Sequence, residues 1–504
     1  MAIAFVLVAT LVLAVVVTAN WYVWRRLFRD TTRGPGLARR AGAVLIAGGW
    51  ALAITALVAE RAGAPFWLQQ TLAWPGFLWL ALSVYLLLGV IAGEVVRPLL
   101  RRLLERRART RGATEPGPEA TPGAPAGSRA AGDAGPDSRT PAAPGGPAAP
   151  APQAKGAGAP GAAPAPAQAA HGGGATASET AAEPQTDRGP GTPGGATTAP
   201  PHPQTGPGPE ASEQPFTTTA TTDDTPTPSG PSRRLFVSRV VAGAAAAAAA
   251  GTVGYGTYGV LRGPRVKRVT VPLAKLPRAA HGYRIAVVSD VHLGPVLGRG
   301  FAQRVVDTIN STQPDLIAVV GDLVDGSVKD LGPAAAPLAQ LRARHGSYFV
   351  TGNHEYFSGA EQWVEEVRRL GLIPLENARR EMPYFDLAGV NDVAGEEEGQ
   401  GPDFARALGD RDTARACVLL AHQPVQIHDA VEHGVDLQLS GHTHGGQFWP
   451  GNLLAAAANP TVAGLERYGD TQLYVSRGAG AWGPPTRVGA PSDITLIELA
   501  SKRA

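Results

Sequence analysis

The sequence contains almost no cysteine and only a small excess of positive charge. Cys417 is the single cysteine among 504 residues, which excludes an internal disulfide and any metal site built from cysteine thiolates. It lies in the strand-like run ACVLL, which is typical of a small buried apolar residue. The net charge is only +3, and no basic patch is interleaved with aromatic residues. We therefore expect no binding to nucleic acid.

The first hundred residues lack charge over three long runs. Residues 1–24 carry no charged side chain, are rich in Val, Leu and Ala, and are long enough to span a bilayer. A second uncharged run covers 41–59, and a third lies within 64–93. These runs predict a membrane region over 1–111 with three transmembrane helices. The alternatives are buried helices of a soluble protein or, for the first run, a signal peptide.

Large apolar side chains are nearly absent from residues 112–231, where Phe216 is the only one. Ala, Gly, Pro, Thr and Ser dominate the stretch instead. Such a segment cannot bury enough apolar surface to offset the entropy that ordering costs. We predict a disordered linker between the membrane region and the rest of the chain.

Arginines flank the predicted spans unevenly. Six lie between the first and second spans and seven follow the third, whereas the loop between the second and third holds only Glu60 and Arg61. Because basic loops stay in the cytoplasm, this bias predicts an outward N-terminus and a cytoplasmic linker.

Residues 232–262 resemble a twin-arginine translocation signal. Arg233 and Arg234 precede Leu235 and Phe236, and an uncharged Ala/Gly-rich run follows over 240–261. The segment departs from such signals by being internal, so a basic flank on an ordinary fourth span is the alternative. A fourth membrane helix predicts a multi-pass protein of the cell membrane whose remaining domain is extracytoplasmic, with the twin-arginine machinery as a suspected partner.

In residues 263–504, strand-like runs alternate with helical segments, which predicts an α/β domain. Five of these runs end in polar residues of the types that bind metals. Because ligands gather beyond the carboxyl ends of strands, we expect these side chains to meet at one edge. They are Asp290 and His292, Asp322, Asn353, His422, and His442 with His444.

The blocks around these residues resemble the calcineurin-like metallophosphoesterase superfamily. The matching blocks are Asp290-x-His292, Gly321-Asp322-x-x-Asp325, Gly352-Asn353-His354-Glu355, His422 and Gly441-His442-x-His444. The tail, with Arg477 and Arg487, looks like the exported bacterial branch of that family. The resemblance implies a β-sandwich flanked by helices, here preceded by transmembrane helices and a linker.

The resemblance also implies two divalent cations, and carboxylate with imidazole ligands suits Mn, Fe, Zn, Ni or Co. By resemblance Asp322 bridges the two ions. Asp290, His292 and His444 complete one site, and Asn353, His422 and His442 complete the other. Two such ions would lower the pKa of a bound water that attacks phosphorus.

Further roles follow from the same resemblance. His354 is expected to be a general acid or a hydrogen-bond donor to the transition state, with a role in orienting a ligand as the alternative. Asp325 and Glu355 are expected to fix ligand imidazoles. Arg487 and Arg477 either clamp a phosphate or are solvated surface residues. Trp449 and Trp482 are expected to pack in the core or on the surface, with an apolar substrate groove as the weaker alternative.

We therefore expect a membrane-anchored phosphoesterase that hydrolyses phosphodiester or pyrophosphate bonds. Its expected substrate is a phosphorylated small molecule or lipid, such as a cell-envelope precursor. The alternatives are a phosphomonoesterase and a metal-binding sensory or scaffold module without catalysis.

Overall fold

A computed structural model of the chain describes residues 2–112 and 232–502. Apart from Gly112, the predicted linker lies outside the described residues.

Four helices of the described residues are long and apolar enough to cross a membrane. The first three cover the runs predicted from the sequence, and α3 is much longer than the predicted span, with Pro75 and Pro98 inside it. The fourth begins at Arg233, where the Ser232 side chain accepts a hydrogen bond from the backbone of Leu235. The helices are α1 (Ala2–Trp24), continued by the π-helical η1 (Arg25–Arg29), α2 (Leu37–Arg61), α3 (Phe66–Gly112) and α4 (Arg233–Leu261).

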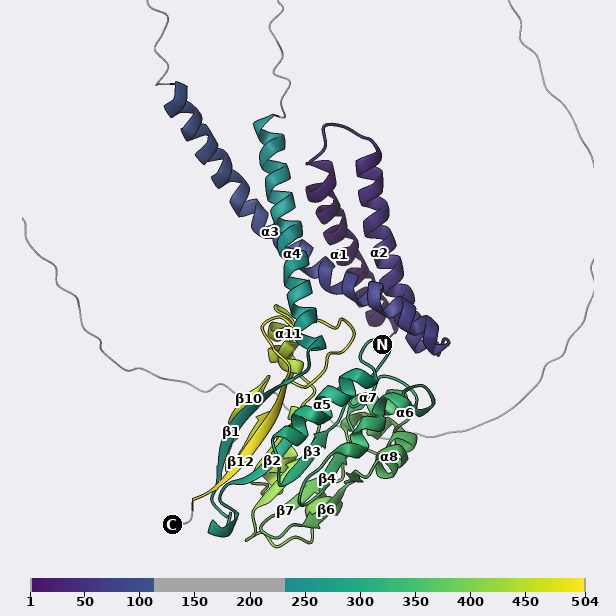
Figure 1. Cartoon of the computed structure of the whole chain (residues 1–504), viewed down its shortest axis with the longest axis vertical. Coiled ribbons are helices and arrows are strands. Elements are labelled where there is room, and N and C mark those ends of the chain that lie inside the picture. Colours follow the sequence, from purple (N-terminus) through teal and green to yellow (C-terminus); the bar gives the residue numbers. More distant parts are fainter. Residues whose placement is uncertain (1, 113–231, 503–504) are drawn as a thin grey trace, which may run out of the picture. The chain divides into compact units, whose positions relative to one another are not determined.

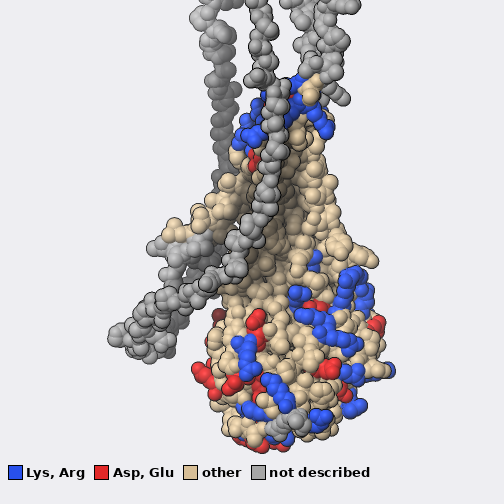
Figure 2. Space-filling model, turned by 90° about the vertical axis from the view of Figure 1, so that its left-hand side faces the viewer, with Lys and Arg blue, Asp and Glu red and all other residues tan. Residues whose placement is uncertain are grey.

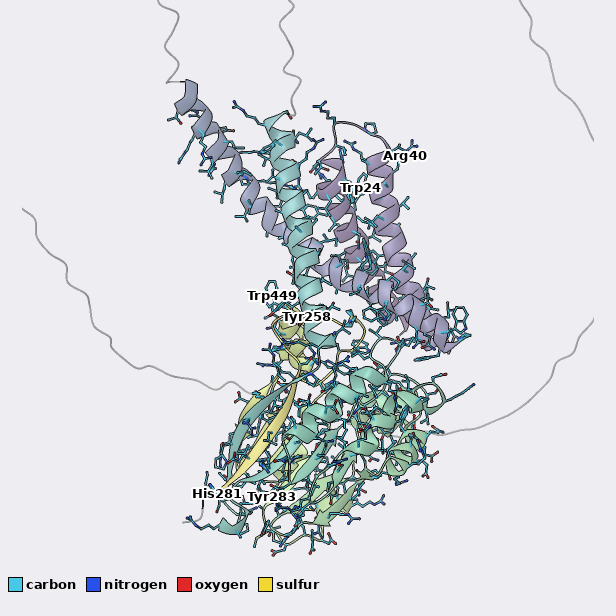
Figure 3. All side chains as sticks on the ribbon, in the orientation of Figure 1. Trp24, Arg40, Tyr258, His281, Tyr283 and Trp449 are labelled. Carbon is cyan, nitrogen blue, oxygen red and sulfur yellow. The ribbon has the colours of Figure 1, made fainter. Side chains whose placement is uncertain are left out.

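The helices extend away from the α/β domain (Figure 1), and Lys and Arg side chains gather toward their far end (Figure 2). Trp24 and Arg40 lie toward the arginine-rich end, whereas Tyr258 and Trp449 lie where α4 leads into the domain (Figure 3). Tyr258 is 63% exposed and Trp449 is 52% exposed. Exposed aromatic residues at a helix end are typical of the membrane–water boundary.

The α/β domain is built on two six-stranded sheets. In the first sheet β2, β3 and β4 are parallel neighbours, and β12 pairs antiparallel with β2 and parallel with β1. Its strands, in spatial order, are β1 (Arg265–Leu273), β12 (Asp493–Ser501), β2 (Tyr283–Val288), β3 (Leu316–Val320), β4 (Ser347–Val350) and β5 (Ile373–Pro374).

The second sheet has a parallel centre and antiparallel margins. Strands β7, β8, β9 and β11 are parallel neighbours, and β6 and β10 pair antiparallel at the two edges. Its strands, in spatial order, are β10 (Gly464–Tyr468), β11 (Thr471–Val475), β9 (Leu437–Ser440), β8 (Cys417–Leu420), β7 (Asp386–Gly389) and β6 (Ala378–Glu381).

Alternate side chains of each sheet pack in different layers. Ile285 and Val287 of β2 face a core shared with Val418 and Leu420 of β8, so the two sheets pack face to face. Ala286 and Val288 instead belong to a second cluster with helices of the outer face. The helices of that face are α5 (Arg299–Ser311), α6 (Val328–Ala335), which continues into η3 (Ala336–Gln340), and α8 (Ala360–Arg369).

Two short helices cover the outer face of the second sheet. Phe404 and Leu408 of α9 (Phe404–Leu408) and Ile427 of α10 (Ile427–Glu432) pack on Cys417 and Leu419 of β8. The remaining helices are η2 (Arg278–Ala280), α7 (Asn353–Ser358), η4 (Val393–Glu398), η5 (Pro424–Gln426), η6 (His444–Gly446) and α11 (Gly451–Ala458). The predicted β-sandwich flanked by helices, preceded by apolar helices, is confirmed.

Candidate metal centre

The predicted ligands follow the carboxyl ends of five strands drawn from both sheets. Asp290 and His292 follow β2, Asp322 follows β3, and Asn353 opens α7 after β4. The second sheet supplies His422 after β8, and His442 with His444 after β9. Strands β2, β3 and β4 are parallel to one another, and so are β8 and β9. Their carboxyl ends therefore meet where the two sheets adjoin.

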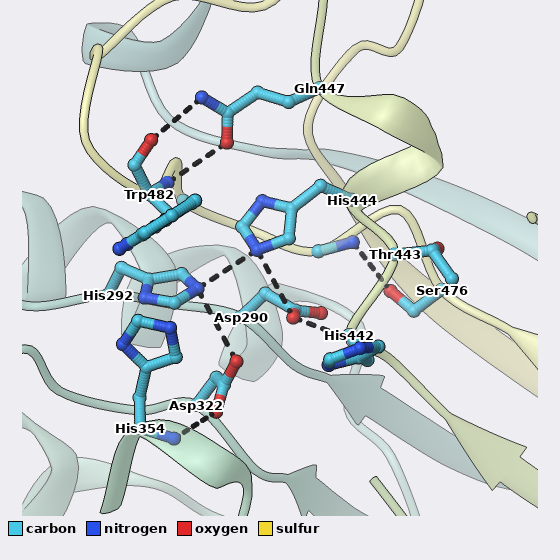
Figure 4. A network of polar contacts seen from close by, with 12 residues as sticks. Asp290, His292, Asp322, His354, His442, Thr443, His444, Gln447, Ser476 and Trp482 are labelled. Carbon is cyan, nitrogen blue, oxygen red and sulfur yellow. Dashed lines mark hydrogen bonds and ion pairs between the residues drawn. The ribbon is translucent and has the colours of Figure 1, made fainter. Parts of the chain in front are cut away.

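The side chains form two groups whose ligand atoms lie within 4.8 Å of one another. Asp322 belongs to both groups, which is the arrangement that a carboxylate bridging two cations requires. One group is Asp290, His292, Asp322 and His444, and the other is Asp322, His422 and His442. Asn353 joins the second group, since its Oδ1 is 3.0 Å from Nδ1 of His442. Figure 4 shows the first group from close by, with His442 beside it.

The backbone at these positions is unusual. Eight described residues other than glycine have a positive φ, and five of them are predicted ligands. Such strained conformations persist where the surrounding structure fixes them, and they are concentrated at functional sites. The five are Asp290, His292, Asp322, His442 and His444, with φ between 48° and 72°.

Space around the carboxylates is tightly filled. A Cβ atom added at Gly441 would lie 2.5 Å from Oδ2 of Asp290. At Gly352 an added Cβ would collide with Oδ1 of Asp322. The small residues beside the ligands are therefore needed for the backbone to pass so close to both carboxylates.

Hydrogen bonds fix the tautomers of two ligand imidazoles. Nδ1 of His422 is 2.9 Å from the carbonyl oxygen of Val320, which only accepts, so the proton lies on Nδ1. Nε2 of His422 lies 3.1 Å from Oδ2 of Asp322 and would present a lone pair to a cation that displaces its proton. In the same way Nδ1 of His292 faces Oδ1 of Asp325 at 2.8 Å, and its Nε2 lies 2.9 Å from Nε2 of His444.

Nε2 of His422 and Nε2 of His292 both face Oδ2 of Asp322, at 3.1 Å and 3.7 Å, and divalent cations on either side of this carboxylate would fit them. Oδ2 of Asp290 is buried without a hydrogen-bond partner among the described residues, and Nε2 of His422 has only the carboxylate of Asp322 beside it. Buried polar atoms without partners are rare and costly. Burial lowers the pKa of His422, but the charge of Asp322 outweighs it and raises that pKa well above the ordinary value. The site therefore attracts positive charge.

The charge states of three other predicted ligands suit a metal, whereas burial raises the pKa of Asp290. Burial lowers the pKa of His442 to about 4, with the charge of His422 acting in the same direction. Burial, His292 and Arg487 together hold the pKa of His444 well below its ordinary value. Burial acts to raise the pKa of Asp322, but His422 and His292 outweigh it and lower it. Neutral imidazole and ionised carboxylate are the forms that bind metals.

His354 lies beside the ligands and is held by Asp325. Its Nδ1 is 2.7 Å from Oδ1 of Asp325, and its backbone N–H donates to Oδ1 of Asp322. Burial acts to lower the pKa of His354, but Asp325 outweighs this effect and raises that pKa to about 9. His354 is therefore protonated at neutral pH in the absence of bound cations and has Nε2–H free to donate.

Asp325 and Glu355 hold different parts of the site. Asp325 accepts from His292 as predicted, and it joins that imidazole to His354. The expectation that Glu355 fixes an imidazole is wrong. Its carboxylate accepts from the backbone N–H groups of Asp322 at 2.9 Å, Leu323 at 2.7 Å and Gly352 at 2.6 Å. Glu355 thus fixes the two loops that carry Asp322 and Asn353.

Arg487 is neither a phosphate clamp nor a solvated surface residue. It is 5% exposed, and its guanidinium donates to the carbonyl oxygens of Gly480, His444 and Ala490. Its Nη2 also lies 3.2 Å from Nδ1 of His444. Both predicted alternatives are wrong, because the loop after Ser476 folds back under His444 and buries the arginine there.

A cavity of about 720 Å³ opens over the centre. Trp482 lines it at 52% exposure, so its predicted packing in the core is wrong. The side chain of Gln447 holds the backbone of Trp482. Its Oε1 accepts from the Trp482 N–H at 3.0 Å, and its Nε2 donates to the Trp482 carbonyl oxygen at 2.9 Å. Trp449 is also exposed but does not line the cavity.

One wall of this cavity could not be predicted from the sequence. Leu57, Glu60 and Arg61, at the end of α2, line it together with His354 and Trp482. They belong to the predicted membrane region and carry no motif, so only the fold brings them to the site.

A sandwich of two sheets with helices outside, and a buried Asp/His cluster at the strand ends, is the architecture of a metallophosphoesterase. The model of the family described as calcineurin-like phosphoesterase matches residues 283–446. An uncharacterized metallophosphoesterase of Aquifex aeolicus is 34% identical over 243 residues, which cover 47% of this chain and 92% of that protein. The chain belongs to the calcineurin-like metallophosphoesterase family.

Two further comparisons are more limited. A zebrafish (Danio rerio) transmembrane protein with metallophosphoesterase domain is 39% identical over 259 residues, 49% of this chain. The match spans 59% of that relative's length. A solved dimetal phosphatase from Danio rerio is 13% identical with a TM-score of 0.30, covering 39% of this chain and 88% of that one. At that TM-score it supports no argument about this chain.

Proposed function

We propose that the protein is a membrane-anchored, metal-dependent phosphoesterase that hydrolyses phosphodiester or pyrophosphate bonds. The observation that supports it most is the pair of ligand groups that share Asp322. The seven proposed ligands are Asp290, His292, Asp322, Asn353, His422, His442 and His444. Two divalent cations bound there would neutralise phosphate charge and activate water for attack on phosphorus.

Side chains next to the proposed ligands would assist that reaction. In its protonated form, His354 would donate from Nε2 to the leaving oxygen or to a phosphate oxygen, while Asp325 holds its ring in place. His354 has a side chain only 15% exposed, so it would meet the substrate inside the cavity. A metal-binding module without catalysis has no need of such a group.

The cavity's rim supports a lipid or cell-envelope substrate. Leu57 and Trp482 line the cavity, and Phe357, which is 77% exposed, adds a third large apolar side chain. Leu57 belongs to α2, one of the helices long enough to cross a membrane. A phosphate ester with an apolar portion could therefore enter from the membrane surface and place its phosphate over the ligands.

For topology, we propose that the catalytic domain is extracytoplasmic and that α4 begins with a twin-arginine-type signal. The arginine-rich ends of the helices support this orientation, since basic segments stay in the cytoplasm. A reporter fused to the C-terminus and active only outside the cytoplasm should be active. Activity of a reporter that works only in the cytoplasm would contradict the orientation.

Activity is tested with the full chain in detergent, Mn²⁺ and bis-p-nitrophenyl phosphate. Hydrolysis should depend on the metal and fall in His354→Ala, whereas His428→Ala, at an exposed histidine on α10, should retain it. A preference for p-nitrophenyl phosphate would favour the monoesterase alternative. No turnover with any of Mn, Fe, Zn, Ni or Co would favour the non-catalytic module.

A further inference from the structure

A second cavity lies among the basic helix ends, far from the candidate metal centre. It measures about 380 Å³, and its lining residues come from η1, the turn before α2, the starts of α2 and α4, and the C-terminal half of α3. Seven of the lining residues are arginines, and Asp30 is the only acidic one. Figure 2 shows Lys and Arg side chains gathered at this end of the helices.

The cavity and the active site lie at opposite ends of α2. Arg39 lines the second cavity, and Arg61 lines the cavity over the metal centre. At 1.5 Å per residue the two positions are about 33 Å apart along the helix. This length is about the thickness of the hydrocarbon core of a bilayer. With α2 across a bilayer, the two cavities would face opposite membrane surfaces.

Arg97 is the residue that distinguishes this cavity from an ordinary basic surface. Its side chain is only 6% exposed, and Nη1 donates to Oε1 of Glu94 at 2.8 Å. Its Nε and Nη2 are buried without a hydrogen-bond partner among the described residues. The positive-inside bias requires arginines near the cytoplasmic surface, and solvated arginines satisfy it. It does not account for a buried guanidinium whose N–H groups lack acceptors.

The acidic groups nearby are already engaged. Glu94 accepts from both Arg97 and Arg26, and Asp30 accepts from Arg26, each at 2.8 Å. Arg39 is held by the hydroxyl of Thr32 at 2.7 Å. The remaining positive charge of the cavity has no carboxylate left to balance it among its lining residues. An anion with several acceptor oxygens would satisfy the donors of Arg97 and reduce the repulsion between the helix ends.

We propose that this cavity binds a phosphate group, with Arg97 as its central ligand, and thereby ties α3 and α4 to the end of α1. The ligand chemistry is a phosphate monoanion or diester. It can come from the headgroup of an anionic lipid in the adjacent leaflet or from a soluble phosphate. The proposal does not depend on the catalytic activity.

The test measures thermal unfolding of the full chain in detergent micelles. Dioleoyl phosphatidylglycerol, dioleoyl phosphatidylcholine and inorganic phosphate are added separately. A ligand that binds only the folded state should raise the unfolding temperature. A rise with phosphatidylglycerol but not with phosphatidylcholine supports a lipid headgroup, and a rise with inorganic phosphate alone supports a soluble source.

Arg97→Gln should abolish most of the rise. Arg102→Gln removes the same charge from an exposed position on the same helix and should keep the rise. If Arg97→Gln does not fold, Arg101→Gln, at an exposed lining position, should reduce the rise instead. No rise with any additive, or a rise that is equal in wild type and in the folded Arg97 or Arg101 variant, would overturn the proposal.

Discussion

Arg487 lies directly behind His444. Its Nη2 is 3.2 Å from Nδ1 of the imidazole, and its Nη1 is 3.1 Å from the carbonyl oxygen of the same residue. Burial lowers the pKa of Arg487 to about 10, so the guanidinium stays charged at neutral pH. One buried cation therefore fixes both the ring and the backbone of a proposed ligand.

Arg487→Lys should weaken metal binding because the flat guanidinium cannot be replaced by a single ammonium group. Changes behind a ligand typically cost about 10- to 100-fold in metal affinity. Mn²⁺ affinity is measured by calorimetry. Arg411→Lys is the matched control, since Arg411 is also buried and donates to the carbonyls of His433 and Gly434. Equal metal affinity in both variants would contradict the role of Arg487.

His354→Ala should reduce kcat without removing metal. The expected loss is about 10²- to 10⁴-fold, as for other residues that transfer a proton in the transition state. Metal content should stay that of the wild type, because no proposed ligand is changed. Parallel loss of metal and activity would instead show that His354 acts as a ligand or supports one.

Trp482→Ala should raise KM for lipid phosphodiesters more than for bis-p-nitrophenyl phosphate. Burying a large apolar side chain contributes about 1.5–3 kcal/mol, which corresponds to tenfold or more in affinity. Trp449→Ala is the control, since Trp449 has the same 52% exposure but does not line the cavity. Equal effects of the two variants on lipid substrates would contradict a groove at Trp482.

Cys417 should not react with thiol reagents in the folded protein. Burial raises its pKa to about 12, so at pH 8 the group is a protonated thiol rather than the reactive thiolate. Ellman's reagent should therefore modify one thiol per chain only after denaturation. Rapid modification of the native protein would show that β8 is accessible.

The strand ends explain why so much of the site could be predicted. A short apolar run followed by Asp or His is a local pattern, and parallel strands bring such ends together wherever they lie in the sequence. The pattern does not assign strands to sheets. Asp322 follows a strand of the first sheet, and His422 follows a strand of the second. Their meeting depends on how the sheets pack.

The wrong predictions about Arg487, Trp482 and Glu355 have a different cause. Arg487 and Trp482 have opposite environments, one buried and one lining a cavity, yet neither position carries a periodic pattern. The environment of each is set by a loop that folds over residues distant in sequence. The resemblance implies that Glu355 fixes an imidazole, but the turn of α7 points its carboxylate at backbone N–H groups. The bonds to Asp322 and Leu323 depend on tertiary packing, whereas the bond to Gly352 is a local contact within the helix cap.

The most direct test measures metal content and hydrolysis together for Asp322→Ala in the full chain. Asp386→Asn is the control, at an aspartate that is equally buried but paired with Arg415. Elemental analysis should find two divalent ions per wild-type and control chain. The Asp322 variant should lose both the ions and the hydrolysis of bis-p-nitrophenyl phosphate. Two retained ions with undiminished hydrolysis in Asp322→Ala would contradict a shared carboxylate at the centre of the site.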